Sequence, residues 1–327
     1  MTGLLVTHRF KAQFGEELIA RAGRDGIALE LVSLPPDPLA RLPVEDVARV
    51  EIAYLSSDVL PEFGKAFFSA THKASHLKWL HVYIAGVDHP VYASMIARGI
   101  HLTTSSGANA EPVAHTAIAG MLALARGLPR WVADQQAHNW NPVRRENLPR
   151  DLREQVMLVV GLGKIGSAIA RLARAFGMRV IGVRRNAVGI EHVDEIHTPD
   201  KLHDLLPRCD WLTLACPLTD ETRGLVNAAM LAKLPRGAQV INISRGEVID
   251  EPALIAALGN GHLAGAYLDV FVREPLPADS PLWDMPNVIV SPHNASASAG
   301  YDLRCNAIFL DNLKRWKHRE PLINEAN

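Results

Sequence analysis

The chain has 327 residues, more than one hydrophobic core usually organises, so we expect two domains. Hydrophobic residues make up 48% of the chain and charged residues 21%, which excludes an intrinsically disordered protein. The formal net charge of -1 gives no electrostatic field that would attract nucleic acid or an anionic membrane. We therefore expect a compact protein whose partner is neither of these.

The cysteines and histidines give no sign of a metal site. The three cysteines, Cys209, Cys216 and Cys305, are widely separated and lack metal-ligand spacing, which is typical of free thiols in a reducing compartment. None of the 14 histidines belongs to an HExxH or HxH arrangement. The apolar run at the N-terminus is too short for a signal peptide, and no later stretch reaches membrane-spanning length. These features predict a cytoplasmic protein without a metal ion.

The first part of the chain alternates short aliphatic or β-branched runs with amphipathic stretches such as residues 15–22, which predicts βαβ units and a parallel sheet. The predicted strands are residues 4–7, 29–34, 50–55, 79–85 and 100–104. A long amphipathic stretch, residues 113–138, then has apolar positions at helical spacing. We expect it to be a helix that links two domains.

A stronger α/β pattern starts after Gln155 and predicts a second parallel sheet. Its predicted strands are residues 156–161, 178–183, 211–216, 240–244, 263–270 and 288–292. Helices are predicted at residues 164–176, 199–206 and 303–316, and the last of these is expected to cross back to the first domain. No internal repeat of fixed period appears, which excludes solenoid and propeller folds.

The segment VVGLGKIGSAIARLA carries the pattern GxGxxG between a predicted strand and a predicted helix. Gly161 would permit the tight turn, Gly163 would let the backbone approach a pyrophosphate, and Gly166 would let the helix pack closely on the strand. The N-terminus of the helix would then face the negative charge of the phosphates. The pattern predicts a dinucleotide site that includes Lys164 and Ile165. A glycine-rich turn without a ligand is the alternative.

The end of the second strand of such a unit normally carries an acidic residue that accepts hydrogen bonds from the adenosine ribose. The segment VIGVRRN has Arg184 and Arg185 there instead. A carboxylate would repel the 2′-phosphate of NADP, whereas guanidinium groups can bind it bidentately. The two arginines therefore favour NADP(H) as cofactor, with NAD(H) possible. The alternative is a solvated pair of surface arginines.

Three further segments, SRGEVID, DVFVREP and SPHNAS, follow the glycine loop in this order. With them the chain resembles the D-isomer-specific 2-hydroxyacid dehydrogenase family over nearly its whole length. The resemblance implies an α/β fold with two doubly wound parallel-sheet domains, a Rossmann cofactor domain inserted in a flavodoxin-like substrate domain. It also implies an NAD(P)-dependent oxidoreductase whose catalytic residues are Arg245, Glu274 and His293.

The chemistry of 2-oxo acid reduction matches these three residue types. The carboxylate of the substrate needs a cation, and Arg245 offers a planar fork; the family implies that it also polarises the keto oxygen. His293 can give a proton to the developing alkoxide and take one during oxidation. Glu274 would accept the other imidazole N–H and stabilise the imidazolium. Taken singly, each could be an ordinary surface or loop residue.

The resemblance implies further cofactor contacts. It places Asp269 near the nicotinamide carboxamide, for which a buried structural aspartate is the alternative. It places Cys216 and Pro217 on a loop that passes under the cofactor, with Thr222 nearby, and makes Cys216 a contact residue and not a nucleophile. The other expected contacts lie beside the catalytic segments: Ile243, Ser244 and Ala295.

The segment YIAGVDHP matches the family segment whose backbone N–H groups hold the substrate carboxylate. Ala85 and Gly86 are therefore expected to bind the substrate together with Arg245 and His293. For Gly86, a simple turn glycine is the alternative. The residue after the histidine, Asn294, departs from the aliphatic residue common in the family.

We expect residues 1–107 and 298–327 to form the substrate domain and residues 108–297 to form the dinucleotide-binding domain. The cleft between them is the expected active site, and its closure would exclude water. The family resemblance implies a homodimer formed largely by the cofactor domains.

The family and the cofactor preference together predict reduction of a small 2-oxo acid, with glyoxylate and hydroxypyruvate as the first candidates. Formate dehydrogenation is disfavoured, because that branch of the family has glutamine where this chain has Glu274. An NAD-dependent phosphoglycerate-type dehydrogenase is less favoured, because the chain shows no appended regulatory domain. A nucleotide-sensing, corepressor-like binding protein on the same fold is the alternative that is not an enzyme.

Overall fold

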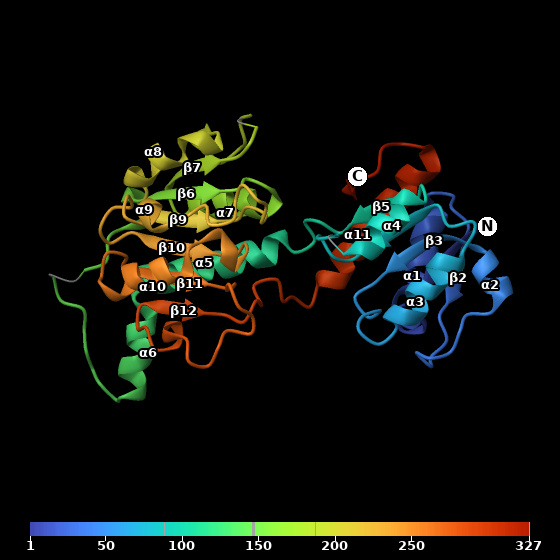
Figure 1. Ribbon diagram of the computed structural model, residues 1–327, viewed down its shortest axis with the longest axis horizontal. Helices are drawn as coiled ribbons and strands as arrows, with labels where there is room; N and C mark the ends of the chain where they lie inside the picture. The colour runs from blue at the N-terminus through green and yellow to red at the C-terminus, as the bar shows by residue number, and fades with distance from the viewer. Residues whose placement is uncertain (88, 146–147, 187, 327) are drawn as a thin grey trace. The chain divides into compact units, whose positions relative to one another are not determined.

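The computed structural model describes all residues except 88, 146–147, 187 and 327 (Figure 1). The chain divides into two compact units, residues 1–108 with 298–327, and residues 109–297. We call them the first and the second unit. In the described part of the chain, no helix combines the length and the apolar composition needed to cross a membrane.

The first unit is built on a six-stranded sheet with the order β13-β5-β4-β3-β1-β2. All neighbouring strands are parallel except the short β13, which runs antiparallel to β5. The strands are β1 (Thr2–Val6), β2 (Leu29–Ser33), β3 (Val50–Leu55), β4 (Trp79–Val82), β5 (His101–Thr104) and β13 (Glu325–Ala326). The order reverses at β1, as expected for a doubly wound sheet.

Helices cover both faces of this sheet, so alternate strand residues enter two separate cores. Leu4 and Val6 of β1 join a cluster with Phe309, whereas Leu5 joins a cluster with Phe67 on the other face. The helices are α1 (His8–Arg24), α2 (Val44–Ala48), α3 (Gly64–Lys73), α4 (Pro90–Ala97) and α11 (Tyr301–His318).

One strand of the first unit is shorter than the sequence predicts. The predicted strand 79–85 ends at Val82. The last ladder contacts are the bonds from Tyr83 N to Leu55 O and from Ser105 N to Val82 O, after which the neighbouring strands also leave the sheet. The chain therefore bends at residues 83–85, and Ala85 and Gly86 lie exposed in a loop at the carboxyl end of the sheet.

The second unit contains a seven-stranded, fully parallel sheet with the order β12-β11-β10-β9-β6-β7-β8. The order reverses between β6 and β9, which makes the carboxyl ends of these strands the expected ligand site of the fold. The strands are β6 (Val156–Val160), β7 (Arg179–Val183), β8 (Glu195–His197), β9 (Trp211–Leu214), β10 (Gln239–Asn242), β11 (Gly265–Leu268) and β12 (Val288–Val290).

The helices of the second unit differ from the sequence prediction in two places. The predicted helix 113–138 is broken into α5 (Ala110–Arg126) and α6 (Leu128–Gln136) by Gly127, whose φ of 73° ends a helix in the left-handed conformation. The predicted helix 199–206 is reduced to α8 (Leu202–Leu205) between two 3-10 turns. The remaining helices are α7 (Lys164–Ala175), α9 (Ala228–Leu231) and α10 (Glu251–Gly259).

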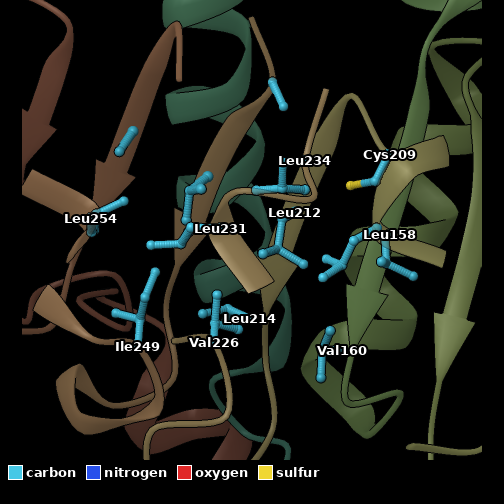
Figure 2. Close-up of a cluster of buried hydrophobic side chains, with 14 of the residues drawn as sticks. Leu158, Val160, Cys209, Leu212, Leu214, Val226, Leu231, Leu234, Ile249 and Leu254 are labelled. Carbon is cyan, nitrogen blue, oxygen red and sulfur yellow. The ribbon is translucent and has the colours of Figure 1, made fainter. Parts of the chain in front are cut away.

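Two apolar cores cover the two faces of the second sheet. On one face, branched side chains of β6 and β9 such as Leu158 and Leu212 pack against Leu231, Leu254 and the turn at Ile249 (Figure 2). On the other face, small residues of α5 and α7, including Ala114, Ala117, Ala170 and Ala173, lie against the sheet. Small side chains permit close approach of a helix to the sheet, and this fixes where the turn between β6 and α7 lies.

Candidate active site

The turn between β6 and α7 needs glycine at two positions because of its contacts. Gly161 has a φ of +98°, and a Cβ there would lie 2.5 Å from Cys216 N. A Cβ on Gly166 would lie 1.9 Å from Gly161 O. These are the tight turn and the close helix packing that the sequence predicted.

Gly163 differs from these two glycines, because no atom lies within 4 Å of the position that its Cβ would occupy. It is the N-cap residue of α7, and it provides no side-chain hydrogen bond that would cap this helix. Because Gly163 has no side chain, the N-cap residue itself contributes no hydrogen bond to the first backbone N–H groups of α7, which lie at the positive end of the helix dipole. A helix N-terminus of this kind fits the diphosphate of a dinucleotide.

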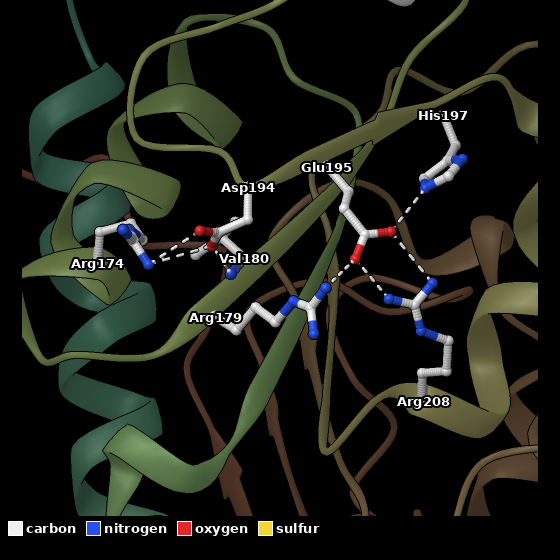
Figure 3. A network of polar contacts seen from close by, with 7 residues as sticks. All are labelled: Arg174, Arg179, Val180, Asp194, Glu195, His197 and Arg208. Carbon is white, nitrogen blue, oxygen red and sulfur yellow. Dashed lines mark hydrogen bonds and ion pairs between the residues drawn. The ribbon is translucent and has the colours of Figure 1, made fainter.

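Arg184 and Arg185 follow β7 at the same end of the sheet. Within the described part of the chain, neither guanidinium has a carboxylate partner. Other arginines around β7 and β8 are paired: Arg174 Nη1 of α7 lies 3.0 Å from Asp194 Oδ1, and Glu195 binds both Arg179 and Arg208 (Figure 3). Two cations are thus left for an anionic ligand at this end of β7.

The carboxylate of Glu195 is the centre of that paired network. Its Oε2 lies 3.1 Å from Arg208 Nη1 and 3.1 Å from His197 Nε2, and Arg179 Nη2 lies 2.5 Å from Oε1 (Figure 3). The hydrogen bonds of Arg208 and His197 lower the pKa of Glu195 to about 2. The short edge strand β8, which the sequence analysis missed, is held to the sheet by these charges.

The loop after β9 lies against the glycine turn, because Cys216 N would touch a Cβ on Gly161. Thr222 Oγ1 donates to Pro217 O at 2.7 Å and accepts from Thr219 N at 2.7 Å, which holds the loop in shape. Cys216 is buried, and burial raises the pKa of its thiol to about 11. A thiol that stays protonated is a poor nucleophile, in line with a contact role.

The structure brings Arg245, Glu274 and His293 together at the carboxyl ends of three neighbouring strands, β10, β11 and β12. His293 Nδ1 lies 2.7 Å from Glu274 Oε2, and Phe271 N donates to Glu274 Oε1 at 3.0 Å. Burial alone would raise the pKa of Glu274, but these two hydrogen bonds and the charges of His293 and Arg245 bring it below its ordinary value. Glu274 is therefore an ionised partner for the imidazole.

The loop that carries Arg245 lies directly against the loop that carries Glu274. A Cβ on the next residue, Gly246, would lie 1.9 Å from the carbonyl carbon of Phe271, so the two loops touch. The side chain of Arg245 is exposed, and its Nη1 donates to Ser244 O at 2.7 Å. Asn242 supports the turn, because its Nδ2 donates to Arg245 O at 3.1 Å and its Oδ1 accepts from Ser244 Oγ at 2.8 Å. Asn242 belongs to no sequence motif and is recognisable only as a buried polar residue on β10, so the sequence does not predict its supporting role.

The hydrogen bonds of Asp269 are those of a structural aspartate, the alternative considered from the sequence. It is buried, and its carboxylate accepts from Ser291 Oγ at 2.6 Å, Asn294 N at 2.8 Å and Ala295 N at 3.1 Å. A contact with the nicotinamide carboxamide stays a prediction. Ile243 and Ala295 are buried in the second unit, whereas Ala85 and Gly86 belong to the first unit, in the loop after β4.

No group of three or more histidine, cysteine or acidic side chains within the described residues could hold a metal ion. The three cysteines are free and buried.

Comparison with known proteins adds the family. Residues 118–295 match the model of the D-isomer specific 2-hydroxyacid dehydrogenase NAD binding domain. A glyoxylate reductase of Korarchaeum cryptofilum is 35% identical over 267 residues, which cover 78% of this chain and 77% of the relative. A D-3-phosphoglycerate dehydrogenase of Methanocaldococcus jannaschii is 32% identical over 78% of this chain, but the match covers only 48% of that longer protein.

A solved structure agrees in fold over nearly the whole chain. The NADPH-dependent glyoxylate/hydroxypyruvate reductase of Sinorhizobium meliloti, crystallised with NADP and sulfate, has a TM-score of 0.72 at 27% identity and covers 99% of this chain and 98% of its own. The fold class and the family resemblance predicted from the sequence are thereby confirmed. The chain belongs to the D-isomer specific 2-hydroxyacid dehydrogenase family and is an NAD(P)-dependent oxidoreductase with a Rossmann cofactor domain.

Proposed function

We propose that this enzyme reduces a small 2-oxo acid, with glyoxylate or hydroxypyruvate as first candidates, to the D-2-hydroxy acid at the expense of NADPH. The observation that carries the proposal is the 2.7 Å contact between His293 Nδ1 and an ionised Glu274, beside the exposed Arg245. A proton donor and a carboxylate-binding cation thus lie in one place. The similarity to a glyoxylate reductase and to an NADPH-dependent glyoxylate/hydroxypyruvate reductase supports the substrate class.

Each catalytic residue has one task in this scheme. The guanidinium of Arg245 binds the carboxylate of the substrate and polarises the keto oxygen. The nicotinamide, when bound, supplies the hydride for the carbonyl carbon. His293 gives the proton from Nε2 to the developing alkoxide, because Nδ1 is engaged by Glu274. In the oxidation direction, neutral His293 takes that proton back.

The residues of the second unit fit a dinucleotide in the order of its parts. The bare N-terminus of α7 suits the diphosphate, and Arg184 with Arg185 suits the 2′-phosphate of NADP(H). The remaining proposed cofactor contacts are Lys164, Ile165, Cys216, Pro217, Thr222, Ile243, Ser244, Asp269 and Ala295. NAD(H) binding needs only the diphosphate and nicotinamide contacts, so it remains as the weaker activity.

In the first unit, we assign Ala85 and Gly86 to the substrate carboxylate, and we assign this unit, residues 1–107 and 298–327, the role of substrate domain. The loop is exposed and lies at the carboxyl end of a doubly wound sheet, where such folds bind ligands. Tyr301 Oη donates to Tyr83 O at 2.7 Å and holds the beginning of the loop. Residues 108–297 are then the dinucleotide domain.

Steady-state oxidation of NADPH and of NADH tests the proposal with glyoxylate, hydroxypyruvate, pyruvate, phenylpyruvate and 3-phosphohydroxypyruvate as substrates. We expect turnover of glyoxylate or hydroxypyruvate, with NADPH preferred. Absence of turnover with every acid would contradict the enzyme proposal and favour a nucleotide-sensing binding protein. A preference for 3-phosphohydroxypyruvate with NADH would favour the second candidate, a phosphoglycerate-type dehydrogenase, which the similarity to D-3-phosphoglycerate dehydrogenases makes worth testing.

The cofactor preference has its own test. The double variant Arg184→Ala/Arg185→Ala is expected to raise the KM for NADPH by about 10- to 100-fold, because a hydrogen bond to a charged group contributes about 1.5 to 3 kcal/mol. The KM for NADH should stay unchanged. Arg174→Ala is the matched control, since it removes an arginine of α7 in the same unit that is already paired with Asp194. Equal loss with both cofactors would contradict the assignment.

The assembly is proposed to be a homodimer formed by the second unit. Helix α6 has no buried residue, and Trp131, Val132 and the following Trp140 are exposed, Trp140 by 95%. Aromatic side chains exposed in such a group mark an interaction surface. Sedimentation velocity of Trp131→Glu should show a monomer where the unchanged protein sediments as a dimer.

We also place the enzyme in the cytoplasm, because its three cysteines are all free.

A further inference from the structure

The backbone of the proposed proton donor is held in an uncommon conformation. His293 has a φ of 50°, in the left-handed region that residues other than glycine rarely adopt. Such a conformation persists only where the surrounding structure over-determines it. The hydrogen bonds around His293 therefore indicate which residues orient its ring toward Glu274.

Asp269 holds the chain on both sides of His293. Its backbone carbonyl accepts from His293 N at 2.9 Å, and its carboxylate accepts from the two following N–H groups, Asn294 N at 2.8 Å and Ala295 N at 3.1 Å. On the other side of His293, Ser291 Oγ donates to Asp269 Oδ1 at 2.6 Å. One buried side chain thus connects residues 291, 294 and 295 of this loop.

A tyrosine extends this chain of hydrogen bonds. Tyr267 Oη lies 2.7 Å from Ser291 Oγ. A serine hydroxyl has a single proton, and that proton goes to Asp269, so the tyrosine must be the donor. Burial raises the pKa of Tyr267, so its hydroxyl keeps the proton that this bond needs. The direction of donation is therefore Tyr267 to Ser291 to Asp269.

We propose that Tyr267 and Ser291 are positioning residues of the reaction: through Asp269 they hold His293 so that its Nδ1 meets Glu274. The proposal rests on the proposed function only in taking His293 as the proton donor. Neither residue touches the reacting atoms. They act by keeping the imidazole in the orientation in which its Nε2 can serve the substrate.

Helix α5 packs against Tyr267 and contacts the loop of His293. A Cβ on Gly120 would lie 2.4 Å from the ring of Tyr267, so the ring packs directly on the helix backbone. Thr116 Oγ1 lies 3.2 Å from Ala295 O, in the loop of His293. The helix begins at Ala110, next to the residue at which the second unit starts. The tyrosine hydroxyl is therefore fixed in place independently of the loop that it orders.

Ser291→Ala is the main test, because it removes the middle of the chain and leaves Asp269, Glu274 and His293 intact. We expect kcat to fall by about tenfold, since a small misplacement of a catalytic group costs that much or more. The Kd for NADPH should stay within about twofold of the wild-type value. Ser291→Thr restores the hydroxyl and should restore most of kcat, and Tyr267→Phe should lower kcat in the same direction. Ser280→Ala, which removes another half-buried serine hydroxyl bonded to backbone in the same unit, is the control that leaves kcat unchanged.

Two results would overturn the proposal. The first is a Ser291→Ala enzyme with a lower Tm but wild-type kcat, which would make the hydroxyl merely structural. The second is equal loss of kcat in Ser291→Ala and Ser291→Thr. If the wild-type protein reduces no 2-oxo acid, the proposed function fails, and the positioning role is tested separately by a crystal structure of Ser291→Ala. The distance from His293 Nδ1 to Glu274 Oε2, 2.7 Å in the wild type, should lengthen beyond hydrogen-bond range, and an unchanged distance would contradict the positioning role.

Discussion

The first strand of each unit leads into a helix through a short turn, and the two turns treat the helix N-terminus in opposite ways. In the first unit, Thr7 caps α1, with its Oγ1 accepting from Phe10 N at 2.9 Å. In the second unit, Gly163 occupies the same place before α7 and has no side chain that could cap it. A capped N-terminus satisfies its own amides, whereas a bare one leaves them to an anion. The same fold step is thus structural in one unit and ligand-binding in the other.

Two histidines, His81 in the first unit and His293 in the second, show the same contrast between a structural and a functional role. His81 is fully buried between Thr103 Oγ1 at 2.7 Å and Ser105 Oγ at 3.0 Å, and burial lowers its pKa to about 3. It is therefore neutral near pH 7. His293 is exposed and bonded to an ionised carboxylate, Glu274. Only a histidine with access to solvent and a partner for its charged form can exchange protons during turnover.

The largest expected effect comes from capping the bare helix. Gly163→Asp introduces a carboxylate at the N-cap of α7, where a Cβ meets no atom within 4 Å. The NADPH affinity should fall by more than about 100-fold, because a like charge beside the diphosphate costs several kcal/mol. The free energy of unfolding should stay equal or rise by about 1 kcal/mol, because aspartate is a good cap. Fluorescence titration with NADPH and thermal unfolding measure the two quantities.

Gly23→Asp is the control for added charge, since Gly23 is an exposed glycine of α1 whose Cβ would also meet nothing. It should leave the NADPH affinity unchanged. Unaltered NADPH binding by Gly163→Asp would mean that the turn does not face the diphosphate.

The next largest effect concerns the partner of His293. Glu274→Gln keeps a hydrogen-bond acceptor but removes the negative charge that stabilises the imidazolium. The rate of reduction at neutral pH should fall by about 10- to 100-fold. Steady-state kinetics of reduction measures this loss, and a Glu274→Gln enzyme with wild-type kcat would contradict the pairing seen in the structure.

Removal of the cap in the first unit should affect stability and not cofactor binding. Thr7→Ala leaves Phe10 N without its acceptor and removes the partly buried hydrogen bond that Thr7 donates to Asp58. The free energy of unfolding should fall by about 1 to 2 kcal/mol. Chemical denaturation measures this loss, while the NADPH affinity serves as the control and should not change. A weakened NADPH affinity would contradict the purely structural role assigned to the turn at Thr7.

The smallest effect is expected at the edge strand β8. Glu195→Gln removes a carboxylate that is shared by Arg179, Arg208 and His197, at a cost of about 1 kcal/mol or less. The pKa of Glu195 is lowered from 4.5 to about 2, so its contribution is present above pH 4.5 and is lost as the pH falls towards 2. The stability difference between wild type and variant should shrink over that window. A difference that is constant down to pH 2 would contradict the charge network.

Features that rest on local residue chemistry could be predicted from the sequence. Gly161 and Gly166 are required by contacts between neighbouring segments of one βα turn, so their spacing carries the information. The trio of Arg245, Glu274 and His293 could be predicted because the segments that carry it resemble the family, and the loops after β10, β11 and β12 bring the three residues together at one edge of the sheet.

Features that depend on distant partners could not be predicted. Strand β8 is three residues long and polar, and the arginines that hold it, Arg179 and Arg208, are not adjacent to it in the sequence. The break between α5 and α6 at Gly127 interrupts an apolar periodicity that continues on both sides. The hydrogen-bond partners of Asp269 lie at the end of another strand. The sequence around Asp269 therefore does not distinguish a structural aspartate from one that binds the cofactor.

The most direct test of the catalytic assignment is steady-state kinetics of His293→Asn with NADPH and glyoxylate or hydroxypyruvate, whichever the wild type prefers. If the histidine is the proton donor, kcat should fall by about 100- to 10,000-fold. The Kd for NADPH should stay within about twofold, because the cofactor is held by the glycine turn and the two arginines. An asparagine variant that keeps near wild-type kcat would show that the proton comes from another group, and would remove His293 from the catalytic set.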